Sequence, residues 1–224
     1  MNVCGWRKKY GVLQDLIDKC EARGEFERAA ALAVFHGDLS ACVSALYRGA
    51  VDVRKLVEEG SSEKGEVQDK HLQSYSETLS LIAMCVSGFN VTASTDGKKK
   101  TTPLWSNACD NLLRRSDITM DSDSLQVSYL RAILVFLQSI GSDDGFNKTI
   151  NDEGLSLADR VAVACQFLPR ASLKSFLESS LSKCIKHGNL EGLLITGLNE
   201  QGIELIQSYT DKTSDVQSAA LISW

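Results

Sequence analysis

The chain has 224 residues, of which 43% are hydrophobic and 24% are charged, and it contains only two prolines. A chain of this length buries roughly 70% of the surface that it exposes when unfolded, so core size does not restrict the fold. The mild net charge of −5 argues against nucleic acid as the main partner, because proteins that bind nucleic acid carry clustered positive charge.

Seven cysteines are spread along the chain, and no two of them form a C-x-x-C pair. An odd number of cysteines, most of them on apolar helix faces, predicts reduced thiols that pack as small hydrophobic side chains in a cytosolic protein. No apolar run follows Met1, and no window approaches 18 consecutive apolar residues, so we expect neither a signal peptide nor a membrane span. The cysteines are Cys4, Cys20, Cys42, Cys85, Cys109, Cys165 and Cys184.

Amphipathic helices are expected from the start of the chain. The first runs over about 12–23, where apolar residues recur at helical spacing, and Gly24 ends it. The second spans about 25–35 and carries small side chains that permit close contact with neighbouring helices. Asp38 then caps a third helix, whose apolar residues are Leu39, Cys42, Val43, Leu46 and Tyr47.

The helical pattern weakens after Gly49. Residues 51–59 predict a short helix, and the charged, Gly/Ser-rich stretch 60–70 predicts a mobile loop. Helicity returns over about 72–87, and the Thr, Ser, Gly and Lys residues of 88–102 then predict a second flexible insert. Pro103 leads the next helix, which runs to about Arg115 with Leu104, Trp105 and Cys109 facing inward.

The remainder of the chain also reads as helical. A helix over about 123–138 is apolar nearly all round, so we expect it at the centre of the fold. Further helices are expected over about 157–168, over 173–184 and from about 215. No segment predicts a strand, because few runs alternate apolar and polar residues with period two.

Two distant stretches, 24–47 and 188–209, share the same order of residue types. Each has a glycine stop, an amphipathic helix, a tight polar turn and a second amphipathic helix. A helical hairpin of this size cannot bury its apolar stripe alone, so it stacks on neighbours. We therefore predict an all-α fold, an irregular α-solenoid of stacked helical hairpins that forms one segment over 1–224. The matched hairpin positions are Gly24 with Gly188, Phe26 with Leu190, Glu27 with Glu191, Ala30 with Leu194, Ala33 with Gly197 and Leu39 with Ile203.

No group of residues predicts a catalytic, cofactor-binding or metal site. Cys184 and His187 lie one turn apart, but two ligands do not make a tetrahedral site, so a core thiol and a helix-end histidine explain them better. His36 is ordinary for the last turn of a helix, residues 143–145 lack the later ligands of a calcium loop, and the lysines of 98–100 are typical of a solvated insert. We therefore expect a protein that is not an enzyme, since an enzyme requires a pocket of convergent ionisable groups.

Two tryptophans lie near the ends of the chain, Trp6 within Cys4-Gly5-Trp6 and Trp224 at the last position. A solvent-exposed tryptophan at either end suits an interface with domains that are adjacent in sequence. Packing as a cap on the solenoid is the alternative interpretation.

Several long signatures resemble one family. These signatures are Cys4-Gly5-Trp6, Gly24–Ala31, Leu155–Phe167 with its Asp-Arg-Val-Ala, Gly188–Leu198 and Asp211–Gln217. Together they are similar to the α-solenoid of the Mio/Mios family. That family supplies the WD-repeat subunit of the coat-like GATOR/SEA assembly. The resemblance covers most of 1–50 and 104–224, whereas residues 51–103 depart from the pattern.

The resemblance implies a non-enzymatic scaffold segment that acts through protein–protein interactions. Its partners would be small nucleoporin-like β-propellers and sister WD-repeat subunits, in a cytoplasmic complex at the lysosomal or vacuolar surface that relays amino-acid supply to the TOR kinase complex. Family members begin with a β-propeller and end with a zinc-binding module; we expect neither here and transfer no metal site or cofactor. A helical-hairpin scaffold of a vesicle-coat or nuclear-pore-type complex is the alternative.

Overall fold

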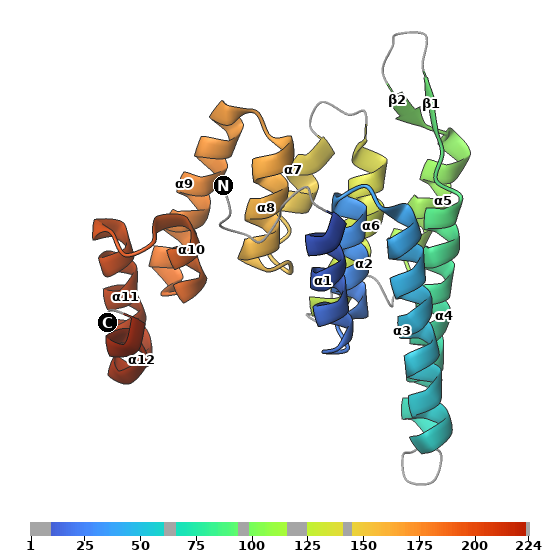
Figure 1. Ribbon diagram of the computed structural model, residues 1–224, viewed down its shortest axis with the longest axis horizontal. Coiled ribbons are helices and arrows are strands. Elements are labelled where there is room, and N and C mark those ends of the chain that lie inside the picture. The colour runs from blue at the N-terminus through green and yellow to red at the C-terminus, as the bar shows by residue number, and fades with distance from the viewer. Residues whose placement is uncertain (1–9, 61–65, 94–98, 116–124, 141–144, 223–224) are drawn as a thin grey trace. The chain divides into compact units, whose positions relative to one another are not determined.

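The computed structural model describes residues 10–60, 66–93, 99–115, 125–140 and 145–222 (Figure 1). These residues form twelve α-helices, one short 3₁₀ helix and two three-residue strands, which confirms the predicted all-α class. The chain divides between Leu155 and Ser156 into two compact units. We call them the N-terminal unit, which ends at Leu155, and the C-terminal unit, which begins at Ser156. The single-segment organisation stays a prediction.

The N-terminal unit is built around α2 (Phe26–Phe35), against which α1, α3 and α6 all pack. Every residue from Ala29 to Phe35 is buried. Four of these seven residues are alanines, and such small side chains let three neighbouring helices approach closely. The other elements of this unit are α1 (Tyr10–Glu21), α3 (Leu39–Gly60), α4 (Glu66–Ser87), β1 (Val91–Ala93), β2 (Lys99–Thr101), α5 (Pro103–Leu113), α6 (Leu125–Ser139) and α7 (Gly145–Ile150).

Helix α6 is the second buried helix of this unit, as its nearly continuous apolar sequence predicts. It packs against α2, α4, α5 and α7. The Phe136 ring lies between rings from two of these helices, edge-on to Phe35 at a centroid distance of 5.0 Å and 5.1 Å from Phe146. The α6 side chains that are almost completely buried are Tyr129, Leu130, Ile133, Leu134 and Leu137.

Helix α3 is longer than the sequence pattern predicts, because Gly49 does not end it. A side chain on Gly49 would begin 2.8 Å from the Phe26 Cβ, so this glycine permits a close contact between α2 and α3. Beyond it, α3 lies beside α4 (Figure 1), and Arg54 donates to the Ser76 and Ser80 hydroxyls at 2.9 and 3.2 Å. The predicted loop over 60–70 is also too long, since residues 66–70 are helical, and 61–65 lie outside the described residues.

The insert over 88–102 is not the plain loop that the sequence predicts. Strands β1 and β2 pair antiparallel, with Val91 opposite Thr101 and Ala93 opposite Lys99. Valine and threonine are β-branched and favour extended backbone, but an isolated two-stranded hairpin is only marginally stable. Strands of three residues are too short to show a clear period-two pattern, so the sequence does not predict them.

The C-terminal unit is organised around α9 (Arg170–His187) and α11 (Glu200–Thr213). Gly188 ends α9 in the left-handed conformation, and a side chain there would begin 3.0 Å from the Tyr209 Cα. Ser208 donates a 2.6 Å hydrogen bond from α11 to the Ile185 carbonyl of α9. The remaining elements are α8 (Leu157–Phe167), the 3₁₀ helix η1 (Leu190–Gly192), α10 (Leu193–Thr196) and α12 (Val216–Ile222).

Substituting Ala33 tests the packing around α2. Ala33→Trp should lower the free energy of unfolding by about 3 kcal/mol, because Ala33 is fully buried and a large side chain forces its neighbours apart. Ala22→Trp, at an exposed position of the same unit, is the control and should change stability by less than about 0.5 kcal/mol. Urea unfolding followed by circular dichroism measures both, and equal stability of the two variants would contradict the close packing of α2.

Candidate interaction surfaces

The residues that the sequence analysis considered as metal ligands or catalytic groups have structural roles. Cys184 is buried, which raises the pKa of its thiol, whereas His187 is exposed and its Nδ1–H donates to the Lys183 carbonyl at 2.9 Å. Burial lowers the pKa of His36, and nearby Asp38 caps α3 by accepting from the Ala41 N–H at 2.9 Å, as predicted. Lys98 and residues 143–144 lie outside the described residues.

Within the described ranges, no cluster of three or more His, Cys, Asp or Glu side chains is placed to hold a metal ion. In the same ranges, no helix combines the length and the apolarity that crossing a bilayer requires. The six cysteines in the described ranges form no disulfide. Cys165 is exposed, so it is not one of the cysteines that pack as small hydrophobic side chains in the core.

Glu27 is a buried carboxylate in the first turn of α2, only 3% exposed. The Tyr75 hydroxyl of α4 donates to its Oε1, while its Oε2 has no hydrogen-bond partner among the described residues. Loss of hydration raises the pKa of Glu27, and the hydrogen bond from Tyr75 opposes that shift. This hydrogen bond links α2 to α4 and ties up the carboxylate inside the fold.

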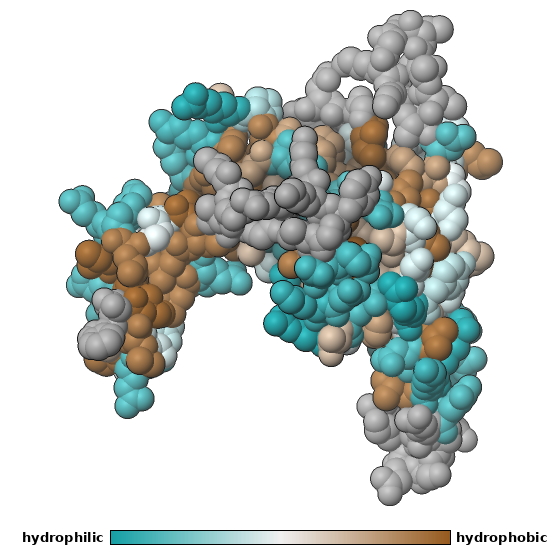
Figure 2. All heavy atoms as spheres, viewed as in Figure 1, coloured by the Kyte–Doolittle hydropathy of each residue, from teal (hydrophilic) through white to brown (hydrophobic). Residues whose placement is uncertain are grey.

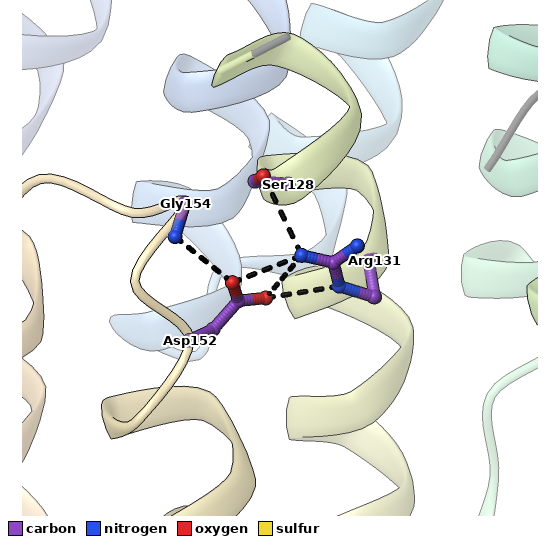
Figure 3. A network of polar contacts seen from close by, with 4 residues as sticks. All are labelled: Ser128, Arg131, Asp152 and Gly154. Carbon is purple, nitrogen blue, oxygen red and sulfur yellow. Dashed lines mark hydrogen bonds and ion pairs between the residues drawn. The ribbon is translucent and has the colours of Figure 1, made fainter. Parts of the chain in front are cut away.

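Arg131 and Asp152 form the main polar contact at the end of the N-terminal unit (Figure 3). The Arg131 Nε and Nη2 donate to the Asp152 carboxylate at 2.8–2.9 Å, and both side chains are about 15% exposed. Asp152 also accepts from the Gly154 N–H at 3.1 Å. Gly154 must lack a side chain, since a Cβ would lie 2.0 Å from the Ser128 Oγ. The pair lines a groove beside α6 and α7, but its two charges neutralise each other.

The two predicted hairpin copies agree at their glycine stops. Gly24 and Gly188 both have positive φ, 75° and 65°, which glycine adopts without strain. Ala30 and Ala33 are completely buried, as an inner helix requires. Four other matched positions are half-buried, namely Phe26, Leu39, Leu190 and Leu194.

The second copy differs from the first in its helices. Its first helix is reduced to η1 and α10, which meet α9 and α11 through Gly192; a Cβ there would lie 2.7 Å from the Cys184 Cβ. Gly197 is matched with Ala33, which predicts a close contact between helices at this position. Nothing lies within 4 Å of a Cβ added at Gly197, so this prediction is wrong. The glycine instead provides a turn with positive φ. Glu191 is exposed although its counterpart Glu27 is buried.

The hairpin alignment matches Ile203 with Leu39 and predicts a core residue at this position. The structure contradicts this prediction, because Ile203 is 62% exposed. Helix α11 begins at Glu200 and turns Gly202, Leu205 and Ile206 inward, which leaves Ile203 at the solvent-exposed edge of that face. Trp6 and Trp224 lie outside the described residues, so their proposed interface role stays a prediction.

Large apolar side chains are exposed on the C-terminal unit, where Leu198, Ile203, Val216 and Leu221 are each at least 60% exposed. Figure 2 shows hydrophobic residues on the part of this unit that carries α11 and α12. Single exposed apolar residues are normal, but several within one small unit favour an interaction surface. We call these four residues the C-terminal apolar set. Ile203, Val216 and Leu221 lie on α11 and α12 outside the buried positions of those helices, and Leu198 lies in the turn before α11.

The N-terminal unit also has exposed apolar residues, of which Leu104 is the most accessible at 82%. The sequence predicts Leu104 on the inner face of α5, but only Trp105 and Cys109 of that helix are buried. Leu104 is the second residue of α5, so the first turn presents it to solvent.

A known protein family matches most of the chain. The family model described as "MIOS, alpha-solenoid" matches residues 1–167. The chain belongs to this family. The match covers the whole N-terminal unit together with α8, and its description confirms both the α-solenoid fold class and the resemblance seen in the sequence.

Relatives of the MIOS solenoid extend over both units. Over 98% of this chain, the sequence is 34% identical to the GATOR2 complex protein MIOS-A of Xenopus laevis. Over 99% of this chain, it is 33% identical to the SEH-associated protein 4 of Saccharomyces cerevisiae. A WD repeat-containing protein of Schizosaccharomyces pombe is 31% identical over 90% of the chain. The chain spans 21%, 17% and 18% of the lengths of these relatives, about a fifth in each case.

Replacing Glu27 tests its burial. The folded-state pKa of Glu27 lies above its unfolded value of 4.5, so its contribution to stability is complete below that value and is lost as pH rises through the folded pKa. Glu27→Gln keeps an acceptor for Tyr75 without a charge, and should therefore lose less stability than the wild type between pH 4.5 and pH 8. Urea unfolding across this pH range measures the difference.

The exposed Glu178→Gln variant is the control for removing one carboxyl group, and it should keep the pH profile of the wild type. A Glu27→Gln profile parallel to the wild type would show that Glu27 is hydrated in the folded protein.

Breaking the Arg131–Asp152 pair tests its contribution to the N-terminal unit. Asp152→Ala should lower the free energy of unfolding by about 2 kcal/mol, because Arg131 keeps its largely buried charge without a partner. Glu178→Ala breaks the exposed pair with Lys174 and should lower it by less than about 0.5 kcal/mol. Urea unfolding compares the two variants, and similar small losses would mean that solvent screens the Arg131–Asp152 pair.

Proposed function

We propose that this MIOS solenoid is a non-enzymatic scaffold segment of a GATOR2- or SEA-type complex. The observation that carries the proposal is the relationship, over nearly the whole chain, to a protein named as part of the GATOR2 complex and to one named as SEH-associated. A protein of this kind acts by holding other subunits in a fixed geometry, and no substrate is converted.

The described interior supports a binding role. Its buried ionisable groups contact partners within the fold, as Glu27 does with Tyr75 and Arg131 with Asp152. They are spread over several helix junctions and do not converge on one deep pocket, which is the arrangement that catalysis requires. The C-terminal apolar set, by contrast, offers hydrophobic area that becomes favourable only when a partner removes it from water.

The partners proposed for this chain are small nucleoporin-like β-propellers and sister WD-repeat subunits. The name of the yeast relative, SEH-associated protein 4, supports a partner outside the chain, and the two partner classes follow from the family resemblance. By the same family resemblance, we place the complex in the cytoplasm at the lysosomal or vacuolar surface. Membrane association is then peripheral and passes through the complex, which relays amino-acid supply to the TOR kinase complex.

Affinity purification from cells tests the scaffold role. The polypeptide that contains this chain is tagged as it is expressed, and its co-purifying subunits are identified by mass spectrometry. Ile203→Glu with Leu221→Glu should reduce their yield at least tenfold, because losing a buried apolar anchor costs about 2 kcal/mol, or about 30-fold in affinity. Leu104→Glu, at an equally exposed position of the other unit, should leave the yield unchanged.

Three outcomes would contradict parts of this proposal. Recovery of vesicle-coat or nuclear-pore subunits in place of propeller and WD-repeat proteins would assign the chain to the alternative complex. Equal loss in all variants, or in none, would remove the C-terminal apolar set from the interface. Unchanged phosphorylation of TOR substrates, when amino acids are restored to cells that lack the protein, would separate it from nutrient signalling.

A further inference from the structure

Two thiols from different helices meet in the N-terminal unit. Cys85 lies in the last turn of α4 and Cys109 in the middle of α5. Their sulfur atoms are 3.4 Å apart, at hydrogen-bonding distance, although the residues are 24 positions apart in the chain. A disulfide has a sulfur–sulfur distance of about 2.05 Å, so bond formation requires an approach of about 1.4 Å.

The surrounding contacts hold the two helices in this position. Trp105, one turn before Cys109, donates from its indole Nε1 to the Cys85 carbonyl at 2.8 Å. The Phe89 ring packs edge-on against the Trp105 ring, with centroids 5.0 Å apart. The end of α4 and the start of α5 are therefore tied together by contacts that do not involve the sulfur atoms.

The two thiols differ in accessibility. Cys109 is completely buried, whereas Cys85 is partly exposed. The hydrogen bond from Cys109 lowers the pKa of Cys85, and the same contact raises the pKa of Cys109. Burial raises the thiol pKa values of Cys165 and Cys184, and neither has a sulfur contact of this kind with another described residue. Cys85 thus combines solvent access with stabilisation of its thiolate, the two properties of a reactive cysteine.

We propose that Cys85 and Cys109 form a redox-active dithiol, which a hydroperoxide oxidises to a disulfide that links α4 to α5. Cys85 is the thiol that reacts with the oxidant, and Cys109 is the resolving thiol. The segment closed by the bond carries the β1–β2 hairpin, so oxidation fixes the two helices from which this hairpin extends. This site is independent of the scaffold function proposed above.

The chemistry proceeds in two balanced steps. The Cys85 thiolate attacks the terminal oxygen of the hydroperoxide, the O–O bond breaks, and the alkoxide or hydroxide that leaves takes up a proton. Sulfur is oxidised by two electrons to a sulfenic acid, and the hydroperoxide is reduced to an alcohol or water. The Cys109 sulfur then attacks the Cys85 sulfur, the S–O bond breaks, and the departing hydroxide takes the Cys109 proton to form water. A dithiol reductant reverses the reaction by thiol–disulfide exchange.

Burial of Cys109 suits this order of events. A hydroperoxide from solvent meets Cys85 first, and the resolving sulfur is already in contact when the sulfenic acid forms. Rapid resolution protects Cys85 from further, irreversible oxidation. Disulfides are usually transient in a reducing compartment such as the cytoplasm proposed above, so the dithiol is the expected resting form there.

The test uses the full chain, reduced and then exposed to hydrogen peroxide. Free thiols are blocked by alkylation, and the peptides are analysed by mass spectrometry with and without reduction. A peptide pair joined through Cys85 and Cys109 should appear, and a dithiol reductant should remove it. Cys85 should be oxidised at least tenfold faster than Cys165, which is also exposed and is the internal control.

Single variants separate the roles of the two cysteines. Cys109→Ser should abolish the cross-link and let a dimedone probe trap the sulfenic acid at Cys85. Cys85→Ser should leave Cys109 unoxidised, and Cys165→Ser should keep the cross-link. Circular dichroism establishes that each variant is folded. Oxidation of Cys85 to a sulfenic acid without a bond to Cys109 in the folded wild type, or oxidation of Cys165 at the same rate as Cys85, would overturn the proposal.

Discussion

Helix α2 can be surrounded by α1, α3 and α6 because most of its inner side chains are no larger than a methyl group. The stretch from Ala29 to Phe35 is completely shielded from water, and the positions of the three neighbouring helices follow from how closely they approach it. Gly49 extends the same constraint, since its missing side chain leaves room for Phe26. Any larger residue at these contacts displaces a whole helix, because a close-packed interior has few voids to absorb it.

Polar contacts then select one arrangement of the helices around this apolar centre. Glu27 joins α2 to α4 through Tyr75, Arg54 joins α3 to α4, and the Arg131–Asp152 pair secures the segment after α7 to α6. Each buried polar group is costly when its partner is missing, so alternative pairings of the helices are disfavoured. The Oε2 of Glu27, which has no hydrogen-bond partner in the described parts of the chain, shows that this selection has a cost in stability.

The C-terminal unit combines a tightly packed interior with an accessible apolar exterior. Gly188 and Gly192 allow α9, η1 and α11 to approach closely, while the C-terminal apolar set faces solvent. A unit of this kind keeps its own fold and still has hydrophobic area to bury against another protein. This division of roles is consistent with the MIOS family assignment and with a function in assembly. The Cys85–Cys109 contact lies in the other unit and adds a chemical property that assembly does not require.

The sequence by itself determined most of the helical segments, although it broke α3 at Gly49 and assigned the start of α4 to a loop. It also determined where Gly24 and Gly188 end helices, and that α2 is apolar and small enough to be enclosed. It also showed the family, because long signatures survive in the order of residues. These properties depend on neighbours within a few positions, and helical periodicity records them. Tertiary structure alone decided that Glu27 is buried while Glu191 is exposed, that Ile203 faces solvent, and that Cys85 meets Cys109. Periodicity shows which residues share a helix face, but only the packing of distant segments determines which face is covered.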